Sequence, residues 1–186
     1  MANHIALLRG VNLAGHKMIA MADLRRLCST LGFDDPRTIL QSGNLVFRGR
    51  KAGAGAARTR EAIERLLEQE TEKRLKVKTT FFVRTAAEWD AIVSRNPLTK
   101  EAGRDPGRML VYCLKDTPAR GAADALRAAI AGPEVAHVIG REAYLYYPDG
   151  VGRSKVTTAI IDRALGTLVT GRNWNTVMKL AALAAT

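Results

Sequence analysis

The chain has 186 residues, of which 47% are hydrophobic and 25% charged, and these are ordinary values for a globular protein. Two cysteines, Cys28 and Cys113, are too few for a four-cysteine zinc site or a disulfide-rich scaffold within one chain. The 29 basic and 18 acidic residues give a net charge of +11, which favours a polyanionic partner. GC-rich coding sequences also raise the number of arginines, so the same excess can arise without any ligand.

Apolar and amphipathic segments alternate through the first half of the chain. Residues 4–8 form an apolar run rich in strand formers, and Gly32 stands where the C-terminal cap of a following helix belongs. The patterns predict, in chain order, a helix at 24–31, strands at 38–40 and 45–47, a helix at 58–74 and a strand at 77–83. This order, β-α-β-β-α-β, is that of a ferredoxin-like unit.

A linking segment and a second series of elements follow. Thr85 and Glu88 have the spacing of a capping box, which predicts a helix that ends at Asn96-Pro97. The second series comprises a strand at 109–114, a helix from Thr117-Pro118 to Gly132-Pro133, strands at 135–139 and 143–147, a helix capped by Ser154 and ended by Gly166, a strand at 167–169 and a helix at 173–184.

We therefore expect an α+β protein of two tandem ferredoxin-like units, residues 1–84 and 108–186, with a linking helix and loop at 85–107 and a C-terminal helix. Ile5–Leu8 and Met109–Leu114 are apolar at consecutive positions, which indicates strands that are covered on both faces. A lone ferredoxin-like sheet carries helices on one face only. The two units are therefore expected to pack into one compact body.

No apolar stretch approaches the ~18 residues that a membrane helix needs, and the N-terminus lacks the pattern of a secretory signal. We expect a soluble, cytoplasmic protein without a membrane partner, and the oligomeric state stays open. The basic excess lies at the two ends, with ten basic and three acidic residues in 1–60 and ten and six in 107–186. Such ends would suit phosphates.

Four polar segments combine cations, amides, hydroxyls and glycines without any carboxylate: Arg9–Lys17, Gln41–Asn44, Gly152–Lys155 and Thr170–Lys179. General acid–base catalysis usually needs a carboxylate or a histidine, and magnesium needs anionic oxygens. These segments therefore indicate binding of a negative ligand, with no metal and no cofactor. Turn and helix-cap chemistry explains several of the same residues, and this structural interpretation stays open.

The first polar segment resembles a nucleotide P-loop in spacing alone. Gly10 and Gly15 are separated as in that motif, but His16 takes the lysine position and Lys17 the hydroxyl position. A glycine loop close to a helix N-terminus nevertheless suits an anion.

Three tyrosines of the second unit bear on nucleic-acid binding. Tyr144 and Tyr146 alternate on one predicted strand and Tyr112 lies on another, as stacking aromatics do in RNA-recognition motifs. The segment 142–147 lacks the glycine and phenylalanine pattern of that motif. Strands that are covered on both faces would also offer no exposed platform.

The leading hypothesis is a protein that binds a small anionic ligand, bearing a phosphate or a carboxylate, between its two halves. The candidate binding residues are Arg9, Asn12, Gln41, Ser42, Asn44, Ser154, Lys155, Arg172, Asn173 and Asn175. One alternative is an enzyme acting on a phosphorylated or nucleotide-like substrate, with His16 or Ser42 as proton-transfer group or nucleophile. Another is a nucleic-acid-binding protein that uses its basic surface.

Five segments also carry a family resemblance: ALLRGVN at 6–12, MADLR at 21–25, LQSGNLVF at 40–47, GRSK at 152–155 and RNWNTV at 172–177. Together they resemble, over nearly the whole chain, the bacterial family called domain of unknown function 1697. The resemblance implies an α+β fold of two ferredoxin-like halves and no established activity. Ala14 stands where the family typically has glycine, and Gly171 stands where threonine is expected.

Overall fold

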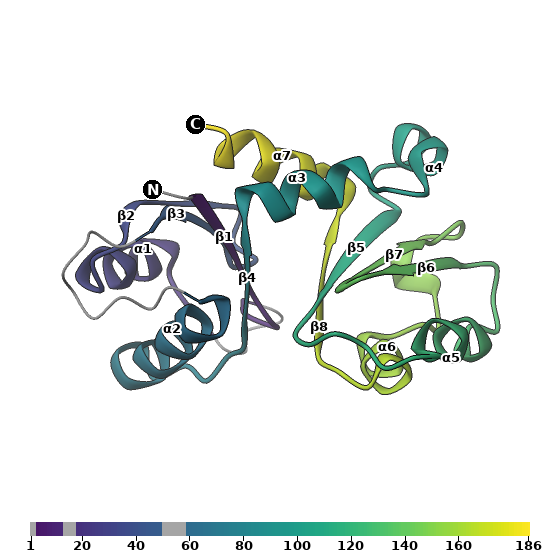
Figure 1. Cartoon of the computed structure of the whole chain (residues 1–186), viewed down its shortest axis with the longest axis horizontal. Coiled ribbons are helices and arrows are strands. Elements are labelled where there is room, and N and C mark those ends of the chain that lie inside the picture. The colour runs from purple at the N-terminus through teal and green to yellow at the C-terminus, as the bar shows by residue number, and fades with distance from the viewer. Residues whose placement is uncertain (1–2, 13–17, 50–58) are drawn as a thin grey trace. The chain divides into compact units, whose positions relative to one another are not determined.

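The computed structural model describes residues 3–12, 18–49 and 59–186. It shows a mixed α+β fold with two four-stranded antiparallel sheets (Figure 1), which confirms that the chain is an α+β protein. The chain divides into two units, of which unit 1 is Met1–Ala91 with Leu180–Thr186 and unit 2 is Ile92–Lys179. No described helix is both long and apolar enough to cross a membrane.

Unit 1 is built from β1 (Asn3–Leu8), α1 (Met21–Thr30), β2 (Asp34–Ile39), β3 (Asn44–Arg48), α2 (Arg60–Leu75) and β4 (Phe81–Thr85). The boundary between the units falls within α3 (Ala86–Ser94). Unit 2 is built from α4 (Thr99–Arg104), β5 (Met109–Leu114), α5 (Ala122–Ala129), β6 (Val135–Ile139), β7 (Glu142–Tyr146), the 3-10 turn η1 (Val151–Arg153), α6 (Thr158–Leu165) and β8 (Val169–Asn173). The second boundary falls within α7 (Trp174–Ala184).

The two sheets have matching topology. The strand order is β2-β3-β1-β4 in unit 1 and β6-β7-β5-β8 in unit 2, and all neighbouring strands are antiparallel. Figure 1 shows α1 and α2 on one side of the first sheet, and α5 and α6 on one side of the second. The second half of the chain therefore repeats the element order and the strand order of the first.

The core of unit 1 lies between its sheet and the helices α1 and α2. Five apolar side chains of these helices are at most 4% exposed: Leu24, Leu27, Cys28, Ile63 and Leu67. The residues Ile5–Leu8 are at most 1% exposed, so both faces of β1 are buried, as their consecutive apolar side chains predict. The Asn3 Nδ2 donates to the Ala184 carbonyl at 2.6 Å, which ties the C-terminal helix to this strand.

The core of unit 2 is built in the same way, with Leu126 of α5 and Ile161 and Leu165 of α6 packed on the sheet. Two phenols lie inside this core. The hydroxyl oxygens of Tyr112 and Tyr147 are 2.8 Å apart and hydrogen-bonded. Burial raises the pKa of both hydroxyls. Pairing the two phenols satisfies polar groups that would otherwise be costly to bury.

The tyrosines that invited a nucleic-acid interpretation are all at most 4% exposed. The hydroxyl of Tyr144 donates to the Ile92 carbonyl at 2.9 Å. In the register of β5 and β7, Tyr112 pairs with Ala143 and Val111 pairs with Tyr144, so Tyr112 and Tyr144 point to opposite faces of the sheet. These rings offer no exposed surface on which bases could stack.

Several predicted helix ends are confirmed. Gly166, at φ +67°, follows α6 directly, and Gly32, at φ +81°, follows the C-cap Leu31 of α1; both are places where a residue without Cβ is favoured. The capping box before α3 is formed, since the Thr85 amide donates to Glu88 Oε2 at 2.8 Å and the Glu88 amide donates to Thr85 Oγ1 at 3.2 Å.

Two other predicted helix starts are wrong. The helix α5 begins at Ala122 after Gly121, whose φ is +87°, so Thr117-Pro118 is not its cap. The helix α6 is capped by Thr157, whose Oγ1 accepts from the Ile160 amide, and not by Ser154. In both cases the chain makes an additional turn before the helix, and local cap chemistry alone does not reveal such a turn.

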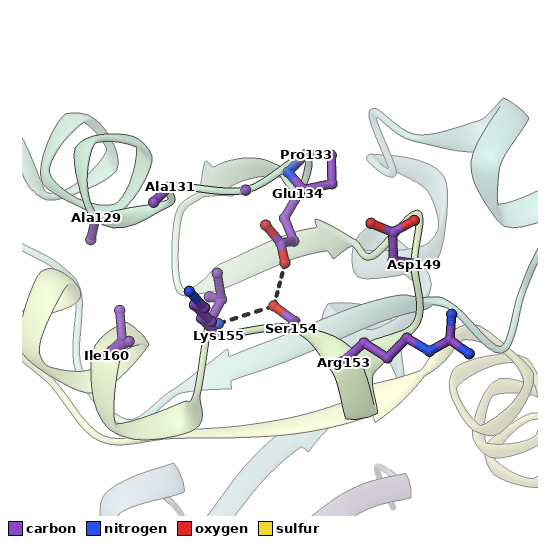
Figure 2. Close-up of a pocket in the computed structure, with 11 residues that line it drawn as sticks. Ala129, Ala131, Pro133, Glu134, Asp149, Arg153, Ser154, Lys155 and Ile160 are labelled. Carbon is purple, nitrogen blue, oxygen red and sulfur yellow. Dashed lines mark hydrogen bonds between the residues drawn. The ribbon is translucent and has the colours of Figure 1, made fainter.

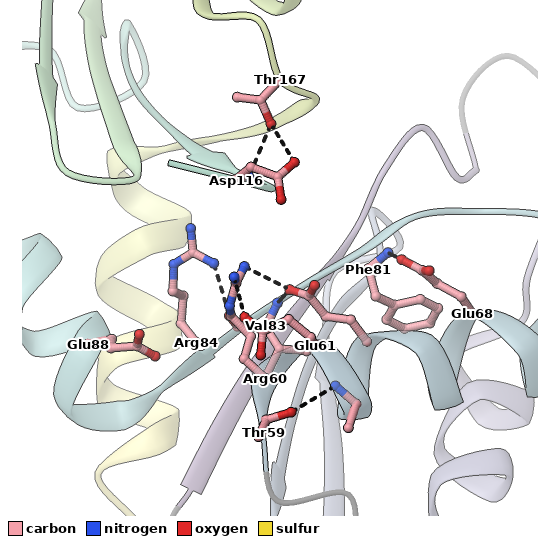
Figure 3. Close-up of polar contacts among 12 residues, drawn as sticks. Thr59, Arg60, Glu61, Glu68, Phe81, Val83, Arg84, Glu88, Asp116 and Thr167 are labelled. Carbon is pink, nitrogen blue, oxygen red and sulfur yellow. Dashed lines mark hydrogen bonds and ion pairs between the residues drawn. The ribbon is translucent and has the colours of Figure 1, made fainter. Parts of the chain in front are cut away.

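Carboxylates of neighbouring helices bond to amides on one edge strand of each sheet. In unit 1, the amides of Phe81 and Val83 in the edge strand β4 donate to Glu68 and Glu64 of α2 at 3.0 and 2.8 Å (Figure 3). Four helical residues advance about 6 Å and two strand residues about 6.8 Å, so the two glutamates match alternate amides. In unit 2, the Val169 amide of the edge strand β8 donates to Asp162 of α6 at 2.8 Å.

Both cysteines are free and buried. Burial raises the pKa of the Cys28 thiol to about 12, so the reactive thiolate is scarce near neutral pH. We expect neither Cys28 nor Cys113 to be alkylated by iodoacetamide in the native protein, and both to react in denaturant. Mass spectrometry of the intact protein measures this, and rapid native labelling of Cys28 would contradict it.

Candidate functional site

The predicted residues of unit 1 gather where β1 ends and the hairpin of β2 and β3 turns. The side chain of Asn12, at φ +55°, accepts from the Ile19 amide at 2.8 Å through Oδ1. Its Nδ2 donates to the carbonyls of Ile19 and Gln41 at 2.9 and 2.6 Å. Asn12 therefore holds its own loop against the hairpin tip.

The hairpin itself is fixed by Asn44, which is fully buried. Its Nδ2 donates to the Ile39 carbonyl at 3.1 Å and to Ser42 Oγ at 2.9 Å. The Gln41 side chain is exposed and Ser42 is half-buried. The structure therefore brings Asn12, Gln41, Ser42 and Asn44 together, with the two asparagine amides bonded to the protein.

The half-buried Arg9 follows directly after β1. Its carbonyl accepts from Thr79 Oγ1 at 2.9 Å, and its amide donates to the Thr80 carbonyl at 3.0 Å. These backbone bonds join the end of β1 to the segment before β4. The neighbouring His16 and Ala14 lie outside the described residues.

The segment around Arg172 is a strand, not the polar loop that the sequence predicts. β8 extends to Asn173 instead of ending at Val169. The Arg172 Nη1 donates to Thr170 Oγ1 at 3.0 Å and to the Gly171 carbonyl at 2.8 Å, and burial lowers the pKa of its guanidinium to about 10.

The two asparagines of this segment have different surroundings. Asn173 caps α7, because its Oδ1 accepts from the amide and the hydroxyl of Thr176 at 3.0 and 2.9 Å. Asn175 is exposed on the first turn of that helix. Asn173 is therefore bonded within the protein, and Asn175 faces solvent.

The glycine at position 171, where the resemblance leads us to expect threonine, has a physical reason in this chain. A Cβ at Gly171 would lie 2.6 Å from the ring of Tyr112, on the neighbouring strand. The aromatic ring occupies the space that a larger side chain would need. Threonine at this position would require Tyr112 to move.

A pocket of about 600 Å³ lies within unit 2 (Figure 2). Its wall combines the loop after α5, the segment from η1 to α6, and Asp149. The lining residues are Ala129, Ala131, Gly132, Pro133, Glu134, Asp149, Arg153, Ser154, Lys155, Val156 and Ile160. This volume lies within the range of small-molecule sites, which are typically about 300–1,000 Å³.

A glutamate and a serine form the polar centre of this pocket. The Ser154 hydroxyl donates to Glu134 Oε1, and the Val156 amide donates to Ser154 Oγ at 3.0 Å. The second carboxylate oxygen, Glu134 Oε2, is buried and has no hydrogen-bond partner among the described residues. Figure 2 shows this oxygen turned away from Ser154. The Glu134 side chain, which lines the pocket, therefore carries an acceptor that the described chain leaves unused.

Charged side chains of both signs stand at the rim. Arg153, Lys155 and Asp149 are exposed. None of them forms an ion pair with any residue in 3–12, 18–49 or 59–186. Two cations that are not neutralised locally can receive an anionic group.

Of the residues predicted from the sequence, Ser154 and Lys155 line this pocket. The idea of a site shared by the two halves stays a prediction. Sequence reasoning missed Glu134, because it searched for segments without carboxylates, and it interpreted the preceding Gly132-Pro133 as a helix terminator. The sequence signal for this site was a charged residue, Glu134, directly after the Gly132-Pro133 helix end.

Within the described part of the chain, no group of three or more His, Cys, Asp or Glu side chains is placed to hold a metal ion. The polar groups of the pocket can therefore act by hydrogen bonding and charge, through a carboxylate acceptor on one wall and cations on the rim.

Comparisons with known proteins agree on the family and on the fold. The family described as Protein of unknown function (DUF1697) matches residues 1–144. The structure is similar to that of the conserved bacterial protein SP0830 from Streptococcus pneumoniae, with a TM-score of 0.73, 17% sequence identity and coverage of 98% of each chain. At that identity the likeness shows the fold alone. Comparison with curated proteins gives no match.

Proposed function

The chain belongs to the family Protein of unknown function (DUF1697), which supplies no activity, and we propose from its geometry that it binds a small molecule bearing a phosphate or a carboxylate in the pocket of unit 2. The observation that carries the proposal is the position of Arg153 and Lys155. Both line a pocket of ligand size, and neither forms an ion pair with a described residue. An anionic group would neutralise them.

The architecture supports this assignment. We interpret each unit as ferredoxin-like, because the order β-α-β-β-α-β with strands arranged 4-1-3-2 is the split pattern of that fold. In unit 2, both walls of the pocket are attached to this scaffold. The loop 131–134 connects α5 to β6, and residues 153–156 lead from η1 into α6. Loops held by rigid elements are common places for ligand sites.

We expect members of a panel of phosphorylated and carboxylated metabolites to raise the melting temperature. A ligand at a hundred times its dissociation constant stabilises the native state by about 2.7 kcal/mol. For a chain of this length that corresponds to a shift of about 5–10 °C. Differential scanning fluorimetry measures the shift, and isothermal titration calorimetry then gives the dissociation constant.

The double variant Arg153→Ala/Lys155→Ala is expected to lose the shift. A matched control, Lys100→Ala/Arg120→Ala, removes two exposed cations of unit 2 that do not line the pocket, and it should retain the shift. Equal loss in both double variants would show that net charge, and not this pocket, attracts the ligand. The enzyme and nucleic-acid interpretations stay predictions of the sequence.

A further inference from the structure

The Glu134 carboxylate carries a charge that the described chain does not compensate. One oxygen accepts from the Ser154 hydroxyl, and the other is buried without a hydrogen-bond partner. Glu134 forms no ion pair with any residue in the described ranges. A buried carboxylate oxygen with no partner is costly, so the site favours any occupant that brings a donor to it.

The donor that fits best is a cation. Ser154 already supplies a neutral hydroxyl, and hydrogen bonds between charged groups are roughly twice as strong as neutral ones. Oε2 is closed to solvent beside Gly132, so the carboxylate has to turn about its soft terminal torsion to present this oxygen to the pocket. An ammonium group would then supply both the missing donor and the missing positive charge. Arg153 and Lys155 line the same pocket and favour an anionic group on the ligand.

The remaining wall is aliphatic. Ala129, Ala131, Val156 and Ile160 line the pocket beside these charged groups. A ligand that fills the site therefore combines an ammonium, an anionic group and an apolar body.

We propose that the pocket of unit 2 recognises a zwitterion of the amino-acid class, with its ammonium on Glu134, its carboxylate on one of the two rim cations, Arg153 or Lys155, and an aliphatic side chain against Ile160. This inference rests on the proposed function and narrows its ligand class. Glu134 is the residue that separates amino acids from the corresponding simple acids.

Gly132 provides a way to move this carboxylate without changing its charge. A Cβ at Gly132 would lie 2.3 Å from Glu134 Oε2, and Gly132 has no positive φ that would strain another residue. Because the crowded atom is the end of a flexible side chain, Gly132→Ala should displace the carboxylate and leave the fold intact. Gly152→Ala is its control, since a Cβ there meets nothing within 4 Å.

The experiment compares leucine with 4-methylpentanoate, which lacks the ammonium, and 3-methylbutylamine, which lacks the carboxylate, by titration calorimetry. We expect leucine to bind at least tenfold more tightly than either analogue. Glu134→Gln and Gly132→Ala should each weaken leucine at least tenfold. Asp124→Asn, which removes an exposed charge of unit 2 that does not line the pocket, and Gly152→Ala should change its affinity less than threefold.

The melting temperature of the unliganded variants separates binding from folding. Glu134→Gln should leave it unchanged or raise it, because a carboxylate with one unpartnered oxygen and no ion pair becomes a neutral amide. The inference is overturned if leucine and 4-methylpentanoate bind equally well, or if Glu134→Gln binds leucine like the parent. In that result the proposed function survives, because an anion still binds. If neither carboxylate-bearing compound binds and the metabolite panel gives no shift, the proposed function fails as well.

Discussion

Replacing Gly43 with alanine is expected to destabilise unit 1 by about 3 kcal/mol or more. At its φ of +72° any other residue is strained, at roughly 1–2 kcal/mol. A Cβ there would also lie 2.7 Å from both Leu8 Cβ and Val11 Cγ2, and overpacking of this kind typically costs about 1–3 kcal/mol. The Gly43 carbonyl accepts from the Leu8 amide at 2.9 Å, so a shifted hairpin tip loses this bond too.

Gly10 is a matched control for this substitution. It has a similar φ, +62°, but a Cβ there meets nothing within 4 Å, so Gly10→Ala should cost only about 1 kcal/mol. Urea denaturation followed by fluorescence of the buried Trp89, in a Trp174→Phe background, reports on unit 1. Equal losses at Gly43 and Gly10 would show that backbone strain, and not crowding against β1, governs the hairpin.

The second large effect is expected at Glu64, whose side chain is 2% exposed. Its Oε1 accepts from the Val83 amide at 2.8 Å and lies 3.7 Å from Arg60 Nη1. Glu64→Ala leaves the amide without this acceptor, creates a small cavity and removes an ion pair. We expect a loss of about 3 kcal/mol in the free energy of unfolding of unit 1.

Glu64→Gln keeps a carbonyl oxygen that can accept from Val83, so it should cost about 1 kcal/mol. Amide hydrogen exchange provides the local measurement. The Val83 amide should lose protection in Glu64→Ala and retain it in Glu64→Gln. Unchanged exchange in Glu64→Ala would mean that another group covers the amide.

The sequence predicts most strands because apolar runs such as Ile5–Leu8 pack on both faces of a sheet. It fails at β8, where Thr170 to Asn173 continue the strand with polar residues and a glycine. An edge strand tolerates such residues because it bonds to one neighbour only. Gly171 is there because Tyr112 fills the adjacent space, and this contact is visible only once the two strands are paired.

The candidate site was predictable in part. A loop rich in cations drew attention to Ser154 and Lys155, because local composition reveals charge. The carboxylate that faces them comes from Glu134, twenty residues earlier, and only the packing of α5 and α6 on the sheet brings it to Ser154. Asn12 and Asn44 were predicted to bind a ligand from their polar side chains. In the structure their side-chain amides instead donate to backbone carbonyls of the hairpin.

The carboxylates that bond to amides of β4 and β8 also protect these edge strands from pairing with strands of other chains. A foreign segment that extended either sheet at those positions would first have to displace Glu64, Glu68 or Asp162 from an amide. At the opposite side of unit 1, Pro36 in β2 has no amide hydrogen to offer, and the register shifts between Asp34 and Arg37. In unit 1 the protection against pairing with other chains is thus distributed over Glu64, Glu68 and Pro36, so that losing one of them does not open both edges of the sheet.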